Sequence, residues 1–307
     1  MIRALDIAAA EAWIRTVIRP SGPIVLERER AWATILRVPL TDGQAWFKAC
    51  GVAQAFEPRL TTELAARWPD RIVRVLAHDP DRAWLLTADA GQPVSIAGNP
   101  PEVWLRALPA YAELQIGEVE HVDEHLAHGV QDLRIAALPG RFDHLLRRED
   151  LPLAPVEMDR LRRFSPRFAE LCERLAADHP VHSIQHDDLH MRSLFDDGTS
   201  LRILDWGDAS IGHPFASLVT TFRFLEELNG LAPADPWFER LRDAYLEPWG
   251  RGLAGTFELA MRVGMVAQLC AWLRHRDAMP EAAAHTFDQQ FAIVLRRALA
   301  RAVDPVI

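Results

Sequence analysis

Two short motifs have residue types that suit metal-dependent chemistry. The first packs two histidines and two aspartates into positions 186–190, with Asp188 at its centre. The second places Asp205 at the end of an apolar run, 17 residues after Asp188 and two positions before Gly207. An aspartate that ends a strand can direct its carboxylate toward a ligand and bind a hard cation such as Mg²⁺. An isolated aspartate of this kind is more often a turn residue, but its pairing with a second acidic motif favours a functional site.

Lys48 is a third candidate because it is the single lysine of the chain. The 34 basic residues comprise 33 arginines and this one lysine. A sequence-wide preference for arginine would have replaced it too, unless its environment requires a compact point charge that arginine does not provide. From composition alone, the chance survival of one lysine explains the observation equally well.

The composition indicates a globular protein and narrows its partners. Of the 307 residues, 49% are hydrophobic and 25% are charged, which excludes the disordered and fibrous classes. The net charge of −9 disfavours nucleic acid as a partner and favours a cationic or metal-chelated small ligand. The three cysteines lack the spacing of a zinc site or a disulfide framework and predict buried thiols. No stretch is long and apolar enough to cross a membrane, so we expect a cytoplasmic protein with no membrane partner, while its oligomeric state stays open.

The first ninety residues have the pattern of a small sheet. Short β-rich runs alternate with turn signals, and the turn at 41–44 predicts a hairpin whose second strand carries Lys48 near its end. Apolar residues recur at helical spacing in two segments. The predicted elements are helices over 3–18 and 55–68 and strands over 24–26, 33–38, 45–49, 72–76 and 83–87.

The pattern changes to long helices beyond residue 91. Only two short strands, over 193–195 and 201–204 and joined by a turn at 196–198, are predicted to interrupt them. We therefore expect an α+β chain with a sheet lobe over 1–88, a hinge at 87–91 that borders a ligand, and a mainly helical lobe over 89–307. The predicted helices are 101–116, 140–148, 156–176, 214–228, 236–247, 255–276 and 281–302.

The motifs together resemble those of a known enzyme family. Residues 186–193 resemble the His-x-Asp-x-x-x-x-Asn catalytic loop of the aminoglycoside phosphotransferase-like and choline kinase-type small-molecule kinases. Leu-Asp-Trp-Gly at 204–207 resembles their metal-binding motif, and Gly-His-Pro at 212–214 resembles the segment that follows it. Lys48 matches their phosphate-binding lysine. The resemblance spans roughly residues 30–225, and the ordered set is more specific than any single motif.

The resemblance implies a protein-kinase-like fold, with both lobes in one kinase domain, and phosphoryl transfer. It implies that the γ-phosphate of ATP or GTP moves to a hydroxyl of a small molecule, with Asp188 as the base that takes or orients the hydroxyl proton. His186 is implied to be a loop scaffold whose imidazole hydrogen-bonds the backbone. Asp205, with Ser193, is implied to hold Mg²⁺ against the phosphates.

The same resemblance implies a nucleotide site on the first lobe. Its residues are Lys48, a carboxylate partner on the following helix, and Thr87 and Asp89 at the hinge. Glu57 and Glu63 both compete as the lysine partner. Glu57 is preferred because it shares the apolar face of the predicted helix; the alternative is that both glutamates are solvated surface charges.

Two departures from the family pattern leave alternatives open. Ser193 stands where the family has a metal-binding asparagine, and the chain has no asparagine between Asn99 and Asn229. A nucleotide-binding pseudokinase or binding module with little turnover is therefore an alternative. The loop at 27–30 also lacks the glycines that would cover phosphates. A metal-dependent hydrolase built on the cluster at 186–190 is a further alternative.

The acceptor has no sequence signature. The acidic residues Glu226, Glu227 and Asp235 could bind a polycation such as an aminoglycoside, in keeping with the net negative charge. A solvated helix face explains the same residues and is the more common case.

Overall fold

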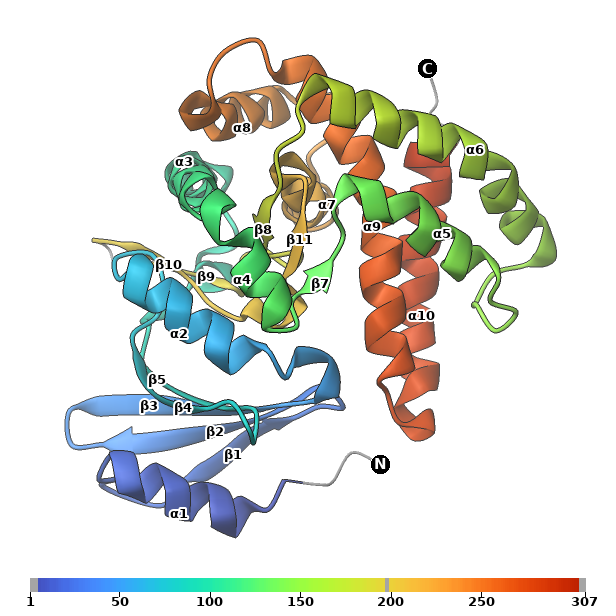
Figure 1. The fold of residues 1–307 in the computed structure, drawn as a ribbon. Coiled ribbons are helices and arrows are strands. Elements are labelled where there is room, and N and C mark those ends of the chain that lie inside the picture. Colours follow the sequence, from blue (N-terminus) through green and yellow to red (C-terminus); the bar gives the residue numbers. More distant parts are fainter. Residues whose placement is uncertain (1–4, 197–198, 304–307) are drawn as a thin grey trace. The chain divides into compact units, whose positions relative to one another are not determined.

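The computed structural model describes residues 5–196 and 199–303, and these form two compact units (Figure 1). The first unit contains the chain to residue 96 together with 191–208 and 278–280, and the second contains the remainder. The segment 191–208, with Ser193 and Asp205, thus clusters with the N-terminal sheet. The lobe boundary after residue 88 stays a prediction. Within the two described ranges, no helix is long and apolar enough to span a bilayer.

A five-stranded antiparallel sheet in the order β1-β2-β3-β5-β4 forms the centre of the first unit. Side chains alternate across β3, so Phe47 is buried on one face while its neighbour Lys48 points to the other. Gly43, with φ of 103°, provides the tight turn between β2 and β3. The strands are β1 (Val25–Glu29), β2 (Ala33–Leu40), β3 (Gly43–Cys50), β4 (Val75–Asp79) and β5 (Trp84–Ala88).

Two helices cover this sheet, one on each face (Figure 1). The helix α1 (Ile7–Val17) begins at Asp6, whose side chain accepts from the backbone of Ala9, and it packs Trp13 against Phe47. The helix α2 (Glu57–Arg67) lies on the Lys48 face and buries Leu60 and Leu64. All helices and strands predicted for this part of the chain are therefore present, within a few residues of their predicted bounds.

A small sheet in the order β10-β9-β6 completes the first unit. The strands β9 (Leu194–Asp196) and β10 (Leu201–Ile203) pair as the predicted hairpin, and β6 (Gln92–Pro93) adds to its edge. Residues 197 and 198 of the predicted turn lie outside the described residues. The start of β9 and the end of β10 are paired neighbours, which brings Ser193 and Asp205 to the same end of the hairpin.

The second unit is mainly helical and contains a three-stranded sheet in the order β7-β11-β8. The expectation of only two short strands beyond residue 91 was wrong. The additional strands have two or three residues each, which is too short to produce a periodic signal. They are β6, β7 (Gln131–Asp132), β8 (Ser183–Gln185) and β11 (Ser210–Gly212).

The helices predicted for this unit are present. The segment predicted as one helix from residue 214 begins with a 3-10 turn, η6 (Pro214–Ser217). The helix α4 was not predicted. The helices are α3 (Pro101–Gly117), α4 (Val122–Ala127), α5 (Leu138–Leu146), α6 (Pro155–Asp178), α7 (Leu218–Asn229), α8 (Pro236–Leu246), α9 (Ala254–Asp277) and α10 (Glu281–Ala298).

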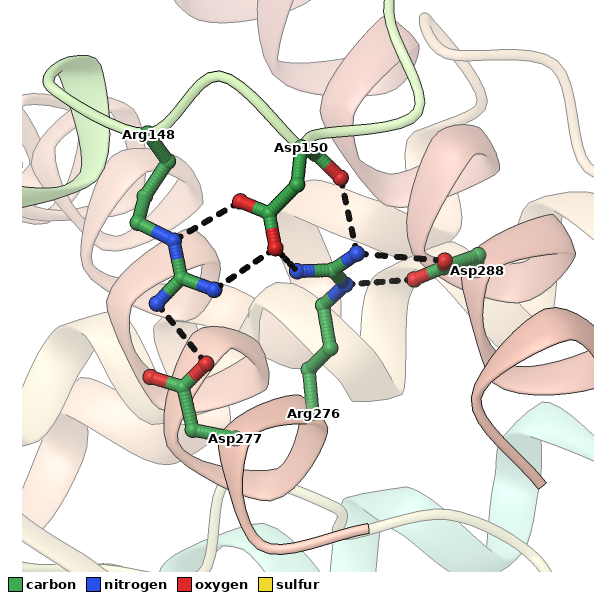
Figure 2. Close-up of polar contacts among 5 residues, drawn as sticks. All are labelled: Arg148, Asp150, Arg276, Asp277 and Asp288. Carbon is green, nitrogen blue, oxygen red and sulfur yellow. Dashed lines mark hydrogen bonds and ion pairs between the residues drawn. The ribbon is translucent and has the colours of Figure 1, made fainter. Parts of the chain in front are cut away.

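An ion-pair network ties the junction between α9 and α10 to the segment after α5 (Figure 2). Arg276 donates to both carboxylate oxygens of Asp288, at 2.6 and 3.2 Å, and to Asp150. Arg148 donates to both carboxylate oxygens of Asp150 and to Asp277. These contacts join residues 148–150 to residues more than 120 positions later in α9, and they join α9 to α10 across 12 residues.

Candidate functional site

Lys48 lies between two carboxylates in the first unit. Its Nζ is 2.6 Å from Oε2 of Glu57 on α2 and 2.5 Å from Oδ1 of Asp205, just beyond β10. Burial opposes the charge of Lys48, but Asp205 and Glu57 outweigh it and hold the lysine pKa well above its usual value. Lys48 is therefore a cation held in a fixed position. Of Glu57 and Glu63, the structure pairs it with Glu57.

Glu57 is held by a further set of close neighbours that the sequence interpretation missed. The Cys50 thiol lies 3.3 Å from Oε2 of Glu57, the same oxygen that pairs with Lys48. Gly207 approaches so closely that a Cβ there would lie 2.8 Å from that oxygen and 2.6 Å from Cδ of Gln54. Cys50 is only half-buried, whereas Cys172 and Cys270 are buried as predicted. The glycine of the Asp205 motif thus packs directly on the carboxylate that orients the lysine.

Asp205 has an exposed carboxylate at the end of a strand. Its side chain is 60% exposed, and its backbone has φ of 66°, in the left-handed region. Ser193 lies beside it in the chain fold, since the carbonyl of Ser193 accepts from the N–H of Leu204 at 2.9 Å. Ser193 is buried, with 2% of the residue exposed. The exposed carboxylate of Asp205 is an oxygen ligand that fits Mg²⁺, which proteins bind through one or two carboxylates plus substrate phosphates.

Thr87 and Asp89 lie on and after β5. Thr87 is buried and pairs with Trp46 of β3 in the sheet. The Asp89 carboxylate accepts from the Gln44 side chain at 3.0 Å and from the Trp46 indole at 3.4 Å. The ion pairs of Lys48 to described residues involve Glu57 and Asp205 and do not include Asp89. A role for Thr87 and Asp89 at the nucleotide stays a prediction.

In the second unit, His186 is fully buried and fixes the start of the loop that carries Asp188. Its backbone N–H donates to the Tyr111 hydroxyl at 2.9 Å, and its Nδ1 accepts from the N–H of Asp188 at 3.3 Å. The Asp188 side chain is 40% exposed, and its Oδ2 lies 3.4 Å from Nε2 of His190. The imidazole of His186 therefore bonds the loop backbone, while the carboxylate of Asp188 is accessible.

Hydrogen bonds from two other elements fasten this loop on both sides of Asp188. The Asp187 carboxylate accepts from the Ser210 hydroxyl of β11 at 2.5 Å. On α7, the Thr220 hydroxyl donates to the carbonyl of Asp187 at 2.8 Å, and the Thr221 hydroxyl donates to that of Leu189 at 2.7 Å. Among the described residues, the histidines and aspartates of 186–190 form no group of three ligand atoms close enough to share one ion.

Comparisons with known proteins identify the fold. No protein-family model and no curated protein matches the sequence. The structure matches choline kinase LicA from Streptococcus pneumoniae with a TM-score of 0.65 at 11% identity, over 95% of this chain and 99% of that one. The chain has the fold of the choline kinases and aminoglycoside phosphotransferases.

Two further structures support the assignment of this kinase fold. Ethanolamine kinase from Plasmodium vivax matches with a TM-score of 0.64 at 11% identity, over 94% of this chain and 85% of that one. Aminoglycoside 2'-phosphotransferase-IIIa, solved as a GDP complex, matches with a TM-score of 0.64 at 16% identity, over 96% and 98%. The predicted α+β kinase-like fold is confirmed.

In this kinase fold, the acidic stretch on α7 does not present a row of open carboxylates. Glu226 accepts from Arg297 at 2.7 Å and from Arg301 through both of its oxygens at 3.1 Å. Asp235 caps α8 by accepting from the backbone of Trp237 at 2.9 Å. The interpretation of Glu226 as a solvated surface charge was therefore wrong, and its ion pairs also weaken the case for it as a polycation ligand.

Proposed function

We propose that the protein transfers the γ-phosphate of ATP or GTP to a hydroxyl of a small molecule. The observation that carries this proposal is the ion-pair cluster of Lys48, Glu57 and Asp205 within a kinase fold. A lysine oriented by a helix glutamate, next to an exposed aspartate, is the arrangement that protein kinases use to hold nucleotide phosphates and metal. The neighbours named as choline kinase, ethanolamine kinase and aminoglycoside phosphotransferase support the small-molecule class.

The nucleotide is proposed to bind through the first unit. Lys48 would neutralise the α- and β-phosphates, and Glu57 would keep the ammonium in place, because their 2.6 Å contact is buried. Thr87 and Asp89 are proposed to border the nucleotide at the hinge. Asp205, with Ser193, would hold Mg²⁺, which supplies charge neutralisation of the phosphates when bound.

Asp188 is proposed as the base of the reaction. The acceptor hydroxyl oxygen would form the new bond to the γ-phosphorus as the bond to the bridging β,γ-oxygen breaks, and the hydroxyl proton would pass to the Asp188 carboxylate. His186 positions this carboxylate by accepting from the Asp188 N–H. The net charge of −9 favours a cationic acceptor such as an aminoglycoside on composition alone.

Calorimetry with ATP and GTP, with and without Mg²⁺, tests the nucleotide site. We expect Mg²⁺-dependent binding that Asp205→Ala abolishes and that Glu57→Gln weakens by about tenfold, because the variant removes a charged partner of Lys48. Glu63→Gln is the matched control on the same helix and should leave binding unchanged. Absence of nucleotide binding by the wild type would refute the proposal.

Turnover tests the role of Asp188 separately. With an acceptor found by screening for ADP release, Asp188→Asn should reduce kcat by about a hundred-fold or more while leaving nucleotide binding intact. Full activity of this variant would show that Asp188 is not the base.

The burial of Ser193 favours one alternative, a nucleotide-binding protein with little turnover. The hydroxyl of a buried serine is a poor replacement for an amide oxygen that must reach a metal ion. This alternative predicts Mg²⁺–ATP binding without phosphorylation of any acceptor, and a gain of activity in Ser193→Asn.

A further inference from the structure

Arg223 on α7 is a largely buried guanidinium without a hydrogen-bond partner among the described residues. Its side chain is 12% exposed, and its Nε is buried and unsatisfied. Within residues 5–196 and 199–303, the one ion pair of Arg223 places Nη1 3.8 Å from Oε2 of Glu227, beyond hydrogen-bond length. A guanidinium has five N–H donors, and a desolvated charge with unused donors is costly unless a partner completes it.

The position of Arg223 relates it to the loop that carries Asp188. The Thr220 and Thr221 hydroxyls bind that loop on both sides of Asp188. Arg223 lies three residues after Thr220 on α7, within one helical turn. Burial lowers the pKa of Arg223, whereas the charges of Glu227 and Asp188 raise it, which places its guanidinium within electrostatic reach of Asp188.

The aromatic residue beside Arg223 is already engaged. The guanidinium carbon of Arg223 lies 4.6 Å from the centre of the Phe224 ring, and the His190 ring meets Phe224 edge-on at 4.7 Å. A quaternary ammonium is bound through open aromatic faces, so these contacts leave little of Phe224 for such a ligand. This stretch of α7 therefore offers the guanidinium of Arg223 and its N–H donors next to Asp188. It does not offer an open aromatic face for a cationic ligand.

The surrounding charges do not satisfy Arg223 either. Glu226 is committed to Arg297 and Arg301 by three hydrogen bonds. Glu227 lies 3.8 Å from both Arg223 and Arg297 and hydrogen-bonds neither. The Nε of Arg297 is also buried and unsatisfied within the described part of the chain. Arginine donors thus remain unused on this face of the second unit.

We infer that the acceptor hydroxyl compound carries a carboxylate, or another anionic oxygen group, that binds Arg223 beside Asp188. A planar carboxylate matches the fork of guanidinium donors and supplies the missing hydrogen bonds. This inference rests on the proposed function, because it takes Asp188 as the residue that meets the acceptor. It replaces the cationic acceptor favoured by overall composition with an anionic hydroxyl compound.

The test pairs hydroxy acids with their uncharged analogues in the presence of a saturating Mg²⁺–nucleotide complex. The probes are 4-hydroxybutyrate and its amide, homoserine and its amide, glycerol 3-phosphate and glycerol, and choline and kanamycin as cations. Calorimetry measures binding and ADP release measures transfer. We expect at least one anion to bind about tenfold or more tighter than its neutral analogue. The carboxylate and phosphate pairs distinguish the two anionic groups.

Two variants locate the effect. Arg223→Gln should reduce binding of the preferred anion by about tenfold or more while leaving its neutral analogue and Mg²⁺–ATP unaffected. Arg301→Gln is the control. Arg301 is already hydrogen-bonded to Glu226, so its loss should not change anion binding. A loss of folding in Arg223→Gln is checked by its Mg²⁺–ATP affinity, and Arg223→Lys, which keeps the charge, should retain part of the anion preference.

The outcomes separate the inference from the proposed function. Phosphorylation of choline or kanamycin that survives Arg223→Gln, or no preference for any anion over its neutral analogue, would overturn the inference and leave the kinase assignment intact. Failure of Mg²⁺–ATP to bind would refute the proposed function, while anion binding that is lost in Arg223→Gln in nucleotide-free protein would still support the assignment of Arg223.

Discussion

The Tyr111 hydroxyl accepts a hydrogen bond from the backbone N–H of His186 at 2.9 Å. The same hydroxyl lies 2.5 Å from the Ser217 hydroxyl and accepts from the Gln115 side chain at 3.2 Å. All four residues are buried. A tyrosine of α3 therefore fixes the backbone at the start of the Asp188 loop, and burial raises the pKa of its phenol, which stays protonated.

We expect Tyr111→Phe to reduce kcat more than it raises KM. The variant leaves the buried N–H of His186 unpaired, which costs about 1–3 kcal/mol and loosens the loop that holds Asp188. Urea unfolding and steady-state kinetics measure the two effects. Tyr245→Phe is the control, because the Tyr245 hydroxyl donates to Gln115 at 2.6 Å and does not contact His186. Equal kinetic effects of both variants would show that the whole buried network matters, not the contact to His186.

Gly207→Ala is expected to weaken nucleotide binding although it removes no charged group. The new Cβ would lie 2.6 Å from Cδ of Gln54 and 2.8 Å from Oε2 of Glu57, so it must displace the carboxylate that pairs with Lys48. We expect a loss of about tenfold in Mg²⁺–ATP affinity by calorimetry. Gly140→Ala on α5 has open space around the new methyl group and should bind the nucleotide normally. Unchanged binding by Gly207→Ala would show that Glu57 does not need this close packing.

Arg276→Lys should destabilise the second unit. The side chain is 11% exposed and makes four hydrogen bonds, to Asp150 and Asp288, which a lysine cannot reproduce in the same fork (Figure 2). We expect the free energy of unfolding in urea to fall by about 1–3 kcal/mol. Arg162→Lys alters a half-exposed pair with Asp159 within α6 and should change stability by less than about 0.5 kcal/mol. Equal effects of the two substitutions would contradict a special role for the network.

The cluster around Lys48 could be predicted because its parts are local patterns. A hairpin signal placed Lys48 on a strand, and helical spacing placed Glu57 on the apolar face of the next helix. Asp205 follows a strand that the apolar run at 201–204 and the turn residues before it indicate. The sequence could not show that Cys50 and Gly207 meet on the same oxygen of Glu57, because that contact depends on packing between segments 150 residues apart.

The residues around Asp188 were harder to predict. Helical spacing identifies the buried face of α3 but not which distant backbone group Tyr111 will contact, here 75 residues away. Arg223 had no distinguishing sequence pattern, since it is one of 33 arginines. That the described residues offer it no hydrogen bond appears only in three dimensions. The ion pairs of Glu226 with Arg297 and Arg301 span 71 and 75 residues, which explains why an exposed acidic face was expected instead.

His213 is expected to make the protein sensitive to acid. The side chain is buried, its Nδ1 accepts from the N–H of Phe215 at 3.3 Å, and its ring lies 5.6 Å from that of His179. Burial, together with His179 and His182, lowers the pKa of His213 to about 3. In the unfolded chain the imidazole takes up a proton near pH 6.5, whereas in the folded protein it stays neutral down to about pH 3. The free energy of unfolding is therefore unaffected by His213 above pH 6.5 and decreases as the pH falls from there toward 3.

The measurement is the free energy of unfolding in urea at several pH values between 7 and 4. His213→Asn keeps a side-chain oxygen that can accept from Phe215 but removes the titrating group. The stability of the wild type relative to this variant should fall by up to about 1.4 kcal/mol for each pH unit below about 6. His121→Asn, at a partly exposed site where the ring contacts Glu124, should follow the wild type. Parallel loss of stability in the wild type and His213→Asn would assign the acid sensitivity to other groups, such as the carboxylate of Asp150, whose pKa Arg148 and Arg276 hold well below its usual value.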